Sequence, residues 1–166
     1  KNIFPYIRDN IDEIVTVPDE ELVVSFLDIV ENHKMIVENS GLLTVAALRH
    51  LDMKNKRIVS ILSGGNMDII TMSSVVQQGL IFRDRIFTVS VLLPDKPGEL
   101  TKVSEVIASQ SGNVIKLEHN QFVSINRNAA VELRITLETF GTEHKNQIIK
   151  ALEEKGYQPK QVRTNI

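Results

Sequence analysis

The turn Asp95-Lys96-Pro97-Gly98-Glu99-Leu100 combines residue types that favour the binding of a small anion. Gly98 has no Cβ, so a ligand can approach the backbone closely there. A helix is expected to begin near Glu99, and the free N–H groups of its first turn can bind a carboxylate. The turn therefore predicts a site for a ligand that carries a carboxylate, with a plain structural loop as the alternative.

Ser63 and Glu38 are the other residues whose types suit chemistry. Ser63 ends an apolar run and is followed by Gly64 and Gly65, and Glu38 stands three residues before Gly41. From spacing alone, the two glycines after Ser63 indicate a tight turn from a strand into a helix. Glu38 is equally compatible with a surface acid beside a helix.

His119 and His144 raise the question of a metal site. The chain contains no cysteine, and neither residue has a second histidine at helical spacing. Metal centres in proteins need several such ligands. These two histidines, like His33 and His50, are therefore interpreted as ordinary polar surface residues, and no metal is expected.

The overall composition argues against several classes of protein. A formal net charge of −2 over 166 residues gives no electrostatic footprint for DNA or RNA. No apolar run approaches the roughly 18 residues of a membrane helix, so no membrane partner is expected. The lack of cysteine and of a signal peptide favours the cytoplasm. A chain that begins at Lys1 without methionine indicates a piece of a longer protein or a trimmed chain.

The apolar pattern predicts the order β-α-α-β-α for the first half. Residues 14–17 are expected to form a short buried strand, followed by a helix from Pro18 to about Asn32. A second helix is expected over 42–50 and a buried parallel strand over 57–62. The third helix should cover 68–77 and stop at Gly79.

The second half predicts the order β-α-β-β-α-β, which is ferredoxin-like. Its strands are expected over 86–93, 114–119, 131–138 and 158–162, with a hairpin loop over 121–128. Thr142 is expected to cap the last helix.

RNA-binding RRM domains share the β-α-β-β-α-β order and bind bases on aromatic residues of the sheet. The outward positions of the third strand here are expected to be solvated, and they offer no aromatic platform for bases. These positions are Glu132, Arg134, Thr136 and Glu138.

Several motifs of the second half resemble those of ACT domains. The 95–100 turn matches the D-x-P-G-x-L turn of that family. Leu117-Glu118-His119, and Leu137-Glu138-Thr139 followed by Glu143-His144, resemble the ACT domain that is fused to single-ACT threonine ammonia-lyases.

The first half resembles the last segment of the catalytic domain of these PLP-dependent enzymes. Residues 63–68 match the run S-G-G-N-[VIM]-D, and residues 38–41 stand where the family shows E-[PG]-[SAT]-[GA], with Asn39 as a departure. The expected fold class is α+β: a ferredoxin-like ACT domain over 84–166, preceded over 1–80 by an incomplete α/β segment of a fold type II catalytic domain.

The resemblance also implies roles for individual residues. The Ser63 hydroxyl would face the pyridine nitrogen of PLP, with Gly64 and Gly65 beside it and Glu38 near the ring. The family's Schiff-base lysine, in a segment S-x-K-x-R-G, and its phosphate-binding glycine loop are absent. No catalytic residue is therefore assigned to this chain, which is expected neither to bind PLP covalently nor to deaminate threonine alone.

For the ACT half, the resemblance implies an amino-acid effector, with isoleucine and valine as the first candidates. The effector would contact the turn at Asp95, Pro97, Gly98, Glu99 and Leu100. Asn113 and Val114 would approach it across a dimer partner, so a homo-oligomer assembled through the ACT domain is expected. The alternative is a free-standing ACT sensor or assembly module that is not attached to a threonine lyase.

Overall fold

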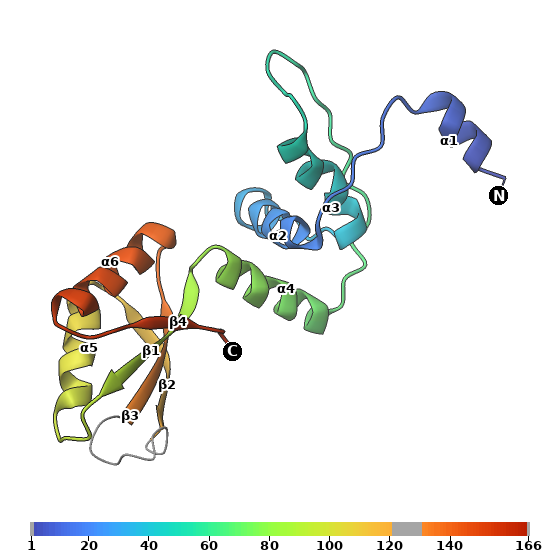
Figure 1. The fold of residues 1–166 in the computed structure, drawn as a ribbon. Coiled ribbons are helices and arrows are strands. Elements are labelled where there is room, and N and C mark those ends of the chain that lie inside the picture. The colour runs from blue at the N-terminus through green and yellow to red at the C-terminus, as the bar shows by residue number, and fades with distance from the viewer. Residues whose placement is uncertain (1, 121–130, 166) are drawn as a thin grey trace. The chain divides into compact units, whose positions relative to one another are not determined.

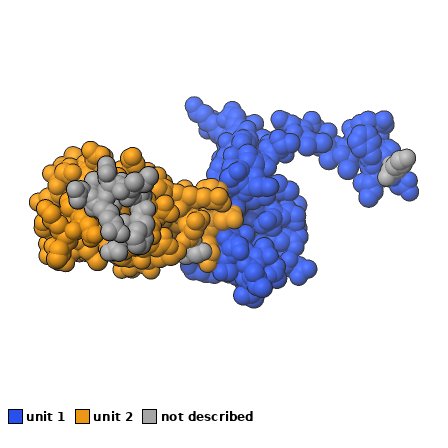
Figure 2. Space-filling model, turned by 60° about the horizontal axis from the view of Figure 1, so that its bottom comes forward, with its two compact units in different colours: residues 1–76 blue, residues 77–166 orange. Residues whose placement is uncertain are grey.

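The computed structural model describes residues 2–120 and 131–165, and it divides the chain into two compact units. Unit 1 covers residues 1–76 and unit 2 covers residues 77–166 (Figure 2). The division lies inside helix α4 (Ile69–Phe82), a few residues before the interval of 80–84 in which the boundary was expected.

Unit 2 is built on a four-stranded sheet with the order β2-β3-β1-β4. Its strands are β1 (Ile86–Leu93), β2 (Asn113–Asn120), β3 (Val131–Glu138) and β4 (Lys160–Val162), and every neighbouring pair is antiparallel. Helices α5 (Glu99–Ser109) and α6 (Thr142–Glu154) lie together beside the sheet (Figure 1). The ferredoxin-like order is therefore confirmed. The hairpin loop expected over 121–128 lies outside the described residues.

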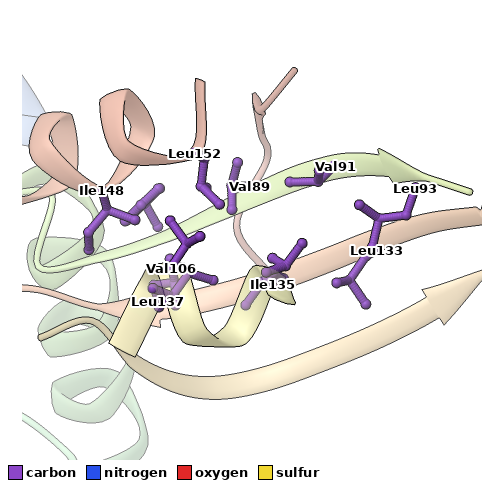
Figure 3. Close-up of a cluster of buried hydrophobic side chains, with 12 residues drawn as sticks. Val89, Val91, Leu93, Val106, Leu133, Ile135, Leu137, Ile148 and Leu152 are labelled. Atoms are coloured by element: carbon purple, nitrogen blue, oxygen red, sulfur yellow. The ribbon is translucent and has the colours of Figure 1, made fainter. Parts of the chain in front are cut away.

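The core of unit 2 forms because alternate residues of the two central strands are apolar. Phe87, Val89 and Val91 of β1 point to the same face as Leu133 and Ile135 of β3. Figure 3 shows Val89, Val91, Leu133 and Ile135 in one cluster with side chains of the two helices. The helices contribute Val103, Val106, Ile107, Ile148 and Leu152.

The opposite face of the sheet is less solvated than the alternation alone suggests. Thr136 is buried there, and its hydroxyl lies 2.9 Å from that of Thr88. Glu132 is largely covered and accepts a hydrogen bond of 2.6 Å from the Ser90 hydroxyl. The hydrogen bond from Ser90 is the main reason that the pKa of Glu132 lies below its ordinary value. Arg134 and Glu138 are exposed as expected.

Two expectations at the start of α6 are wrong. The N-cap of this helix is Gly141, and Thr142 instead donates a hydrogen bond to Asp84. His144 is buried: its Nδ1 accepts a hydrogen bond from the Phe140 N–H, and its Nε2 lies 2.6 Å from the Gln110 carbonyl oxygen. The proton of the neutral ring is therefore on Nε2. His144 joins the ends of two helices and is not a surface residue.

Unit 1 contains helices α1 (Phe4–Asn10), α2 (Asp19–His33) and α3 (Asn39–Ala46), a turn of 3-10 helix (Ala47–His50) and the first part of α4. Helix α2 begins after Pro18 and ends at Lys34, which adopts a left-handed conformation. The apolar face of α2 packs against α3, with Phe26 and Leu42 fully buried. The two central helices were expected, and α1 was not.

The two strands expected in unit 1 do not form. Residues 14–17 and 57–62 are neither helix nor strand, and Val59 and Ile61 are 88% and 73% exposed. A strand needs a hydrogen-bonded neighbour. The described part of unit 1 contains no strand that could serve as one. Helix α4 likewise does not stop at Gly79, which is buried within it, but continues to Phe82.

The connection from α4 to β1 is fastened to the start of α6 by Asp84. Lys145 Nζ lies 2.7 Å from Oδ1 of Asp84, and the Thr142 hydroxyl lies 2.7 Å from Oδ2. The Thr139 hydroxyl donates to the backbone carbonyl oxygen of Asp84. Burial alone would raise the pKa of Asp84, but the hydrogen bonds from Lys145 and Thr142 together lower it below its ordinary value.

We expect the variant Asp84→Asn to destabilise unit 2 in a pH-dependent way. A carboxyl group with a lowered pKa stabilises the fold above the pKa of the unfolded chain, about 3.9, and this contribution disappears as the pH falls through the folded-state value. At pH 7 the free energy of unfolding should fall by about 1–2 kcal/mol. Asparagine tolerates the φ of 54° at this position, so little backbone strain is added.

Urea unfolding of the wild type and the variant between pH 2.5 and 7 measures this difference. The exposed Asp12, changed to Asn, is the matched control and should behave like the wild type throughout. A difference between Asp84→Asn and the wild type that stays constant over the whole pH range would contradict the role of the ionised carboxylate.

Candidate functional site

The structure brings Glu38 and Ser63 together, although 24 positions in the chain separate them. The Glu38 N–H donates to the Gly64 carbonyl oxygen at 3.2 Å. The Glu38 carboxylate lies directly over the Cα of Gly64, where an added Cβ would come within 2.4 Å of both Cδ and Oε1. The two segments therefore meet through the backbone and through the acid side chain.

Gly41 makes the second close contact between these segments. A Cβ at Gly41 would lie 1.7 Å from the Ser63 carbonyl oxygen and 2.8 Å from Cγ1 of Val37. Real Cβ atoms do not approach oxygen so closely, so only glycine fits here. Gly64 adopts a φ of +80°, which also favours glycine. The glycines of both motifs thus allow residues 38–41 and 63–64 to approach each other closely.

Hydroxyl groups hold this arrangement in place. Ser40 donates a 2.6 Å hydrogen bond to Oε1 of Glu38 and so fixes the carboxylate. Thr44 of α3 donates to the Ile61 carbonyl oxygen at 3.0 Å, and Ser60 donates to the Thr44 carbonyl oxygen at 3.3 Å. These two bonds attach residues 60–61 to α3 without a strand. Ser63 itself is exposed, so its hydroxyl can reach a bound molecule.

The second candidate site is a hollow of about 340 Å³ in unit 2, formed around the 95–100 turn. Gly98 has a φ of +90°, and a Cβ placed there would meet nothing within 4 Å, so the turn leaves space beside its backbone. The apolar residues Leu93, Val131 and Leu133 form the floor. All five residues predicted at the turn line this hollow: Asp95, Pro97, Gly98, Glu99 and Leu100.

Not all of the N–H groups that were expected to be free at the start of α5 are without an acceptor. The Glu99 N–H already donates to the Lys96 carbonyl oxygen at 3.4 Å. Gly98, the N-cap, has no side chain that could cap the helix. The remaining N–H donors of the first turn are those of Leu100 and Thr101, because an α-helix leaves its first N–H groups without intrahelical acceptors.

Asn113 and Val114 do not share this hollow within one chain. Asn113 pairs with Glu138 at the far end of β3, whereas the turn follows Leu93, which pairs with Val131. The amide of Asn113 donates to Glu138 Oε2 at 3.1 Å. His119 is exposed, as predicted for a polar surface residue, and it also lines the hollow.

Other classes of site find no support in the described part of the chain. Across residues 2–120 and 131–165, no group of three or more potential ligands is placed to hold a metal ion. None of the helices described is both long and apolar enough to span a bilayer.

No family model matches the chain. Among solved structures, the ACT domain of prephenate dehydrogenase from Bacillus anthracis aligns with 44% of this chain and 99% of its own, at 23% identity and a TM-score of 0.35.

Similarity to curated proteins covers almost the whole sequence. L-threonine ammonia-lyase of Geobacter sulfurreducens is 37% identical over 159 residues, which are 94% of this chain and 39% of the relative. L-threonine ammonia-lyase of Thermotoga maritima is 30% identical over 156 residues, which are 93% of this chain and again 39% of the relative. Over nearly all of its length the chain is therefore homologous to the L-threonine ammonia-lyases, of which it spans about two fifths.

Proposed function

We propose that this chain is the C-terminal regulatory segment of a cytoplasmic L-threonine ammonia-lyase, which converts L-threonine to 2-oxobutanoate and ammonia. The observation that carries the proposal is the contact of Glu38 with Gly64, and of Gly41 with Ser63, in a chain related to such enzymes over most of its length. In this proposal unit 1 completes the cofactor site and unit 2 binds an effector or mediates assembly.

The residues of unit 1 fit a PLP ring. The exposed Ser63 precedes Gly64, and the Glu38 carboxylate lies over the Cα of Gly64, so a hydroxyl and a carboxylate are available to polar atoms at one edge of such a ring. PLP acts as an electron sink when it is bound. Ser63 would hold the pyridine nitrogen through a neutral hydroxyl, which does not force that nitrogen to be protonated. Ser40 would keep the Glu38 carboxylate fixed beside the ring.

The variant Ser63→Ala tests this role in the full-length lyase that carries this chain. Loss of one hydrogen bond of about 1–1.5 kcal/mol should lower kcat by roughly tenfold and change the absorbance spectrum of the bound cofactor. Ser73→Ala, which alters an exposed serine on α4, is the matched control. Unchanged turnover and an unchanged spectrum in Ser63→Ala would mean that Ser63 is only a turn residue.

A second candidate function is that of a free-standing sensor or assembly module, and the edge of the sheet favours it. Strand β2 is an edge strand, and its apolar residues Val114, Ile115 and Leu117 are each roughly 40% exposed. Exposed apolar edges in native proteins are usually covered. Because a bulge interrupts β2 between Val114 and Lys116, the side chains rather than a continuous strand ladder would make the contact.

We therefore expect the chain to self-associate through β2. The variant Ile115→Lys places a charge on this edge and should shift the sedimentation coefficient at high micromolar concentration towards that of a monomer. Gln147→Lys adds the same charge to an exposed position on α6 and should leave the assembly intact. A monomeric wild type, or an equal effect of both variants, would count against assembly at this edge.

A further inference from the structure

We propose that Thr44 is a positioning residue for Ser63: it fixes where residues 60–64 lie along α3, and thereby where the Ser63 hydroxyl stands. The inference rests on the proposed function, because it takes the pyridine nitrogen of PLP as the partner of that hydroxyl. It adds a residue that neither the motifs nor the resemblance indicated. In this inference Thr44 acts only through the backbone of residues 60–63.

Three successive contacts join α3 and its N-cap to residues 60–64. The contacting residues follow one another at intervals of three, and their partners come progressively earlier in the chain. The pairs are Glu38 with Gly64, Gly41 with Ser63, and Thr44 with Ile61. Residues three positions apart lie on one face of a helix. Residues 60–64 therefore run along a single face of α3, in the direction opposite to that of the helix.

The lengths of the two segments match over this stretch. From Glu38 to Thr44 a helix rises by about 9 Å, at roughly 1.5 Å per residue. From Ile61 to Gly64 an extended chain covers about 10 Å, at roughly 3.3 Å per residue. Because the two lengths are nearly equal, all three contacts can form together, and a shift at one end displaces the residues at the other.

Thr44 holds two consecutive residues of the segment. Its hydroxyl donates to the Ile61 carbonyl oxygen at 3.0 Å, and its carbonyl oxygen accepts from the Ser60 hydroxyl at 3.3 Å. This carbonyl group lies in the last turn of α3, where carbonyl groups accept from donors outside the helix. Within the described part of unit 1, no strand pairs with residues 60–63. The hydrogen bonds of Thr44 therefore help to decide where Ser63 lies.

The variant Thr44→Val tests the inference in the full-length lyase that carries this chain, because valine keeps the shape of threonine and removes the hydroxyl. The loss of one hydrogen bond should lower kcat by roughly fivefold and change the absorbance spectrum of the bound cofactor in the same direction as Ser63→Ala. Thr44→Ser keeps the hydroxyl and should restore both. Thr16→Val, which alters an exposed threonine outside the helices, is the matched control and should behave like the wild type.

The 166-residue chain without cofactor provides a second measurement. The Glu38 amide, which donates to the Gly64 carbonyl oxygen, reports whether the segment stays on α3. Its hydrogen exchange should become roughly fivefold faster in Thr44→Val, because the segment leaves the helix more often. In Thr44→Ser the exchange should remain close to that of the wild type.

Combining Thr44→Val with Ser63→Ala distinguishes a positioning role from a merely structural one. If Thr44 acts through Ser63, the double variant should be no slower than Ser63→Ala alone, because the hydroxyl that Thr44 positions is already gone. If the two losses of kcat multiply, Thr44 acts on something else and the inference is wrong.

The remaining outcomes separate this inference from the proposed function. If Ser63→Ala lowers kcat and Thr44→Val does not, the inference is wrong, while the proposed role of Ser63 stands. Faster exchange at Glu38 without a change in kcat or in the spectrum also overturns it, because the Ser63 hydroxyl would then not depend on Thr44. If Ser63→Ala itself has no effect, the proposed role of Ser63 fails, and this inference fails with it.

Discussion

Replacement of Gly41 by alanine is expected to separate residues 38–41 from residues 63–64 and to destabilise unit 1 by about 3 kcal/mol or more. The added Cβ would lie 1.7 Å from the Ser63 carbonyl oxygen, so the backbone of one segment must move. Because the oxygen belongs to the main chain, no side-chain rotation relieves the clash. The Glu38 N–H would then lose its acceptor at Gly64.

Gly65→Ala is the control for this experiment, because a Cβ at Gly65 would meet only the Ile36 carbonyl oxygen at 3.5 Å, an ordinary contact. Hydrogen exchange of the 38–44 amides, together with urea unfolding of the full chain, measures both variants. Gly41→Ala should lose protection at Glu38 and Leu42, and Gly65→Ala should keep it. Equal protection in both variants would show that the two segments do not depend on the close approach at Gly41.

The sequence predicts unit 2 better than unit 1, and the reason is physical. The alternating apolar residues of β1 and β3 pack against the apolar faces of α5 and α6. All four elements lie within the same 90 residues. In unit 1 the apolar run of residues 57–62 has the pattern of a buried strand, but it finds no hydrogen-bonded neighbour in the described residues. An apolar pattern shows that a segment is suited to a buried strand. Whether the strand forms depends on the presence of neighbouring strands to pair with.

The two candidate sites differ in the same way: one is formed by consecutive residues and the other by segments that are distant in the sequence. The turn from Asp95 to Leu100 is contiguous, so its residue types alone indicated a binding loop. The approach of Glu38 to Gly64 depends on how α3 meets a distant segment, and only the resemblance to a family suggested it. His119 is exposed as predicted, but His144 is buried. The sequence could not predict this, because spacing does not report a contact between helix ends such as that of His144 with the Gln110 carbonyl oxygen.

Isoleucine or valine is expected to raise the melting temperature of the chain by several degrees. A ligand that binds only the folded state adds about 2.7 kcal/mol at a hundredfold excess over its Kd. For a chain of this size, each kcal/mol corresponds to roughly 2–4 °C. Differential scanning fluorimetry with all twenty amino acids measures the shift, and the largest shifts should come from aliphatic side chains that can contact Leu93 and Val131.

The variant Gly98→Val should abolish this shift, because its side chain would fill the space in which the carboxylate of the ligand is expected to lie. Valine at a φ of +90° is also strained, so the variant will melt at a lower temperature even without ligand. Gly156→Val separates the two effects: Gly156 has a φ of +85°, a Cβ there would likewise meet nothing within 4 Å, and the residue does not line the hollow. Both variants should start from a lowered melting temperature, and only Gly156→Val should respond to isoleucine. If both respond, the ligand binds elsewhere. If no amino acid shifts the wild type, unit 2 serves assembly rather than sensing.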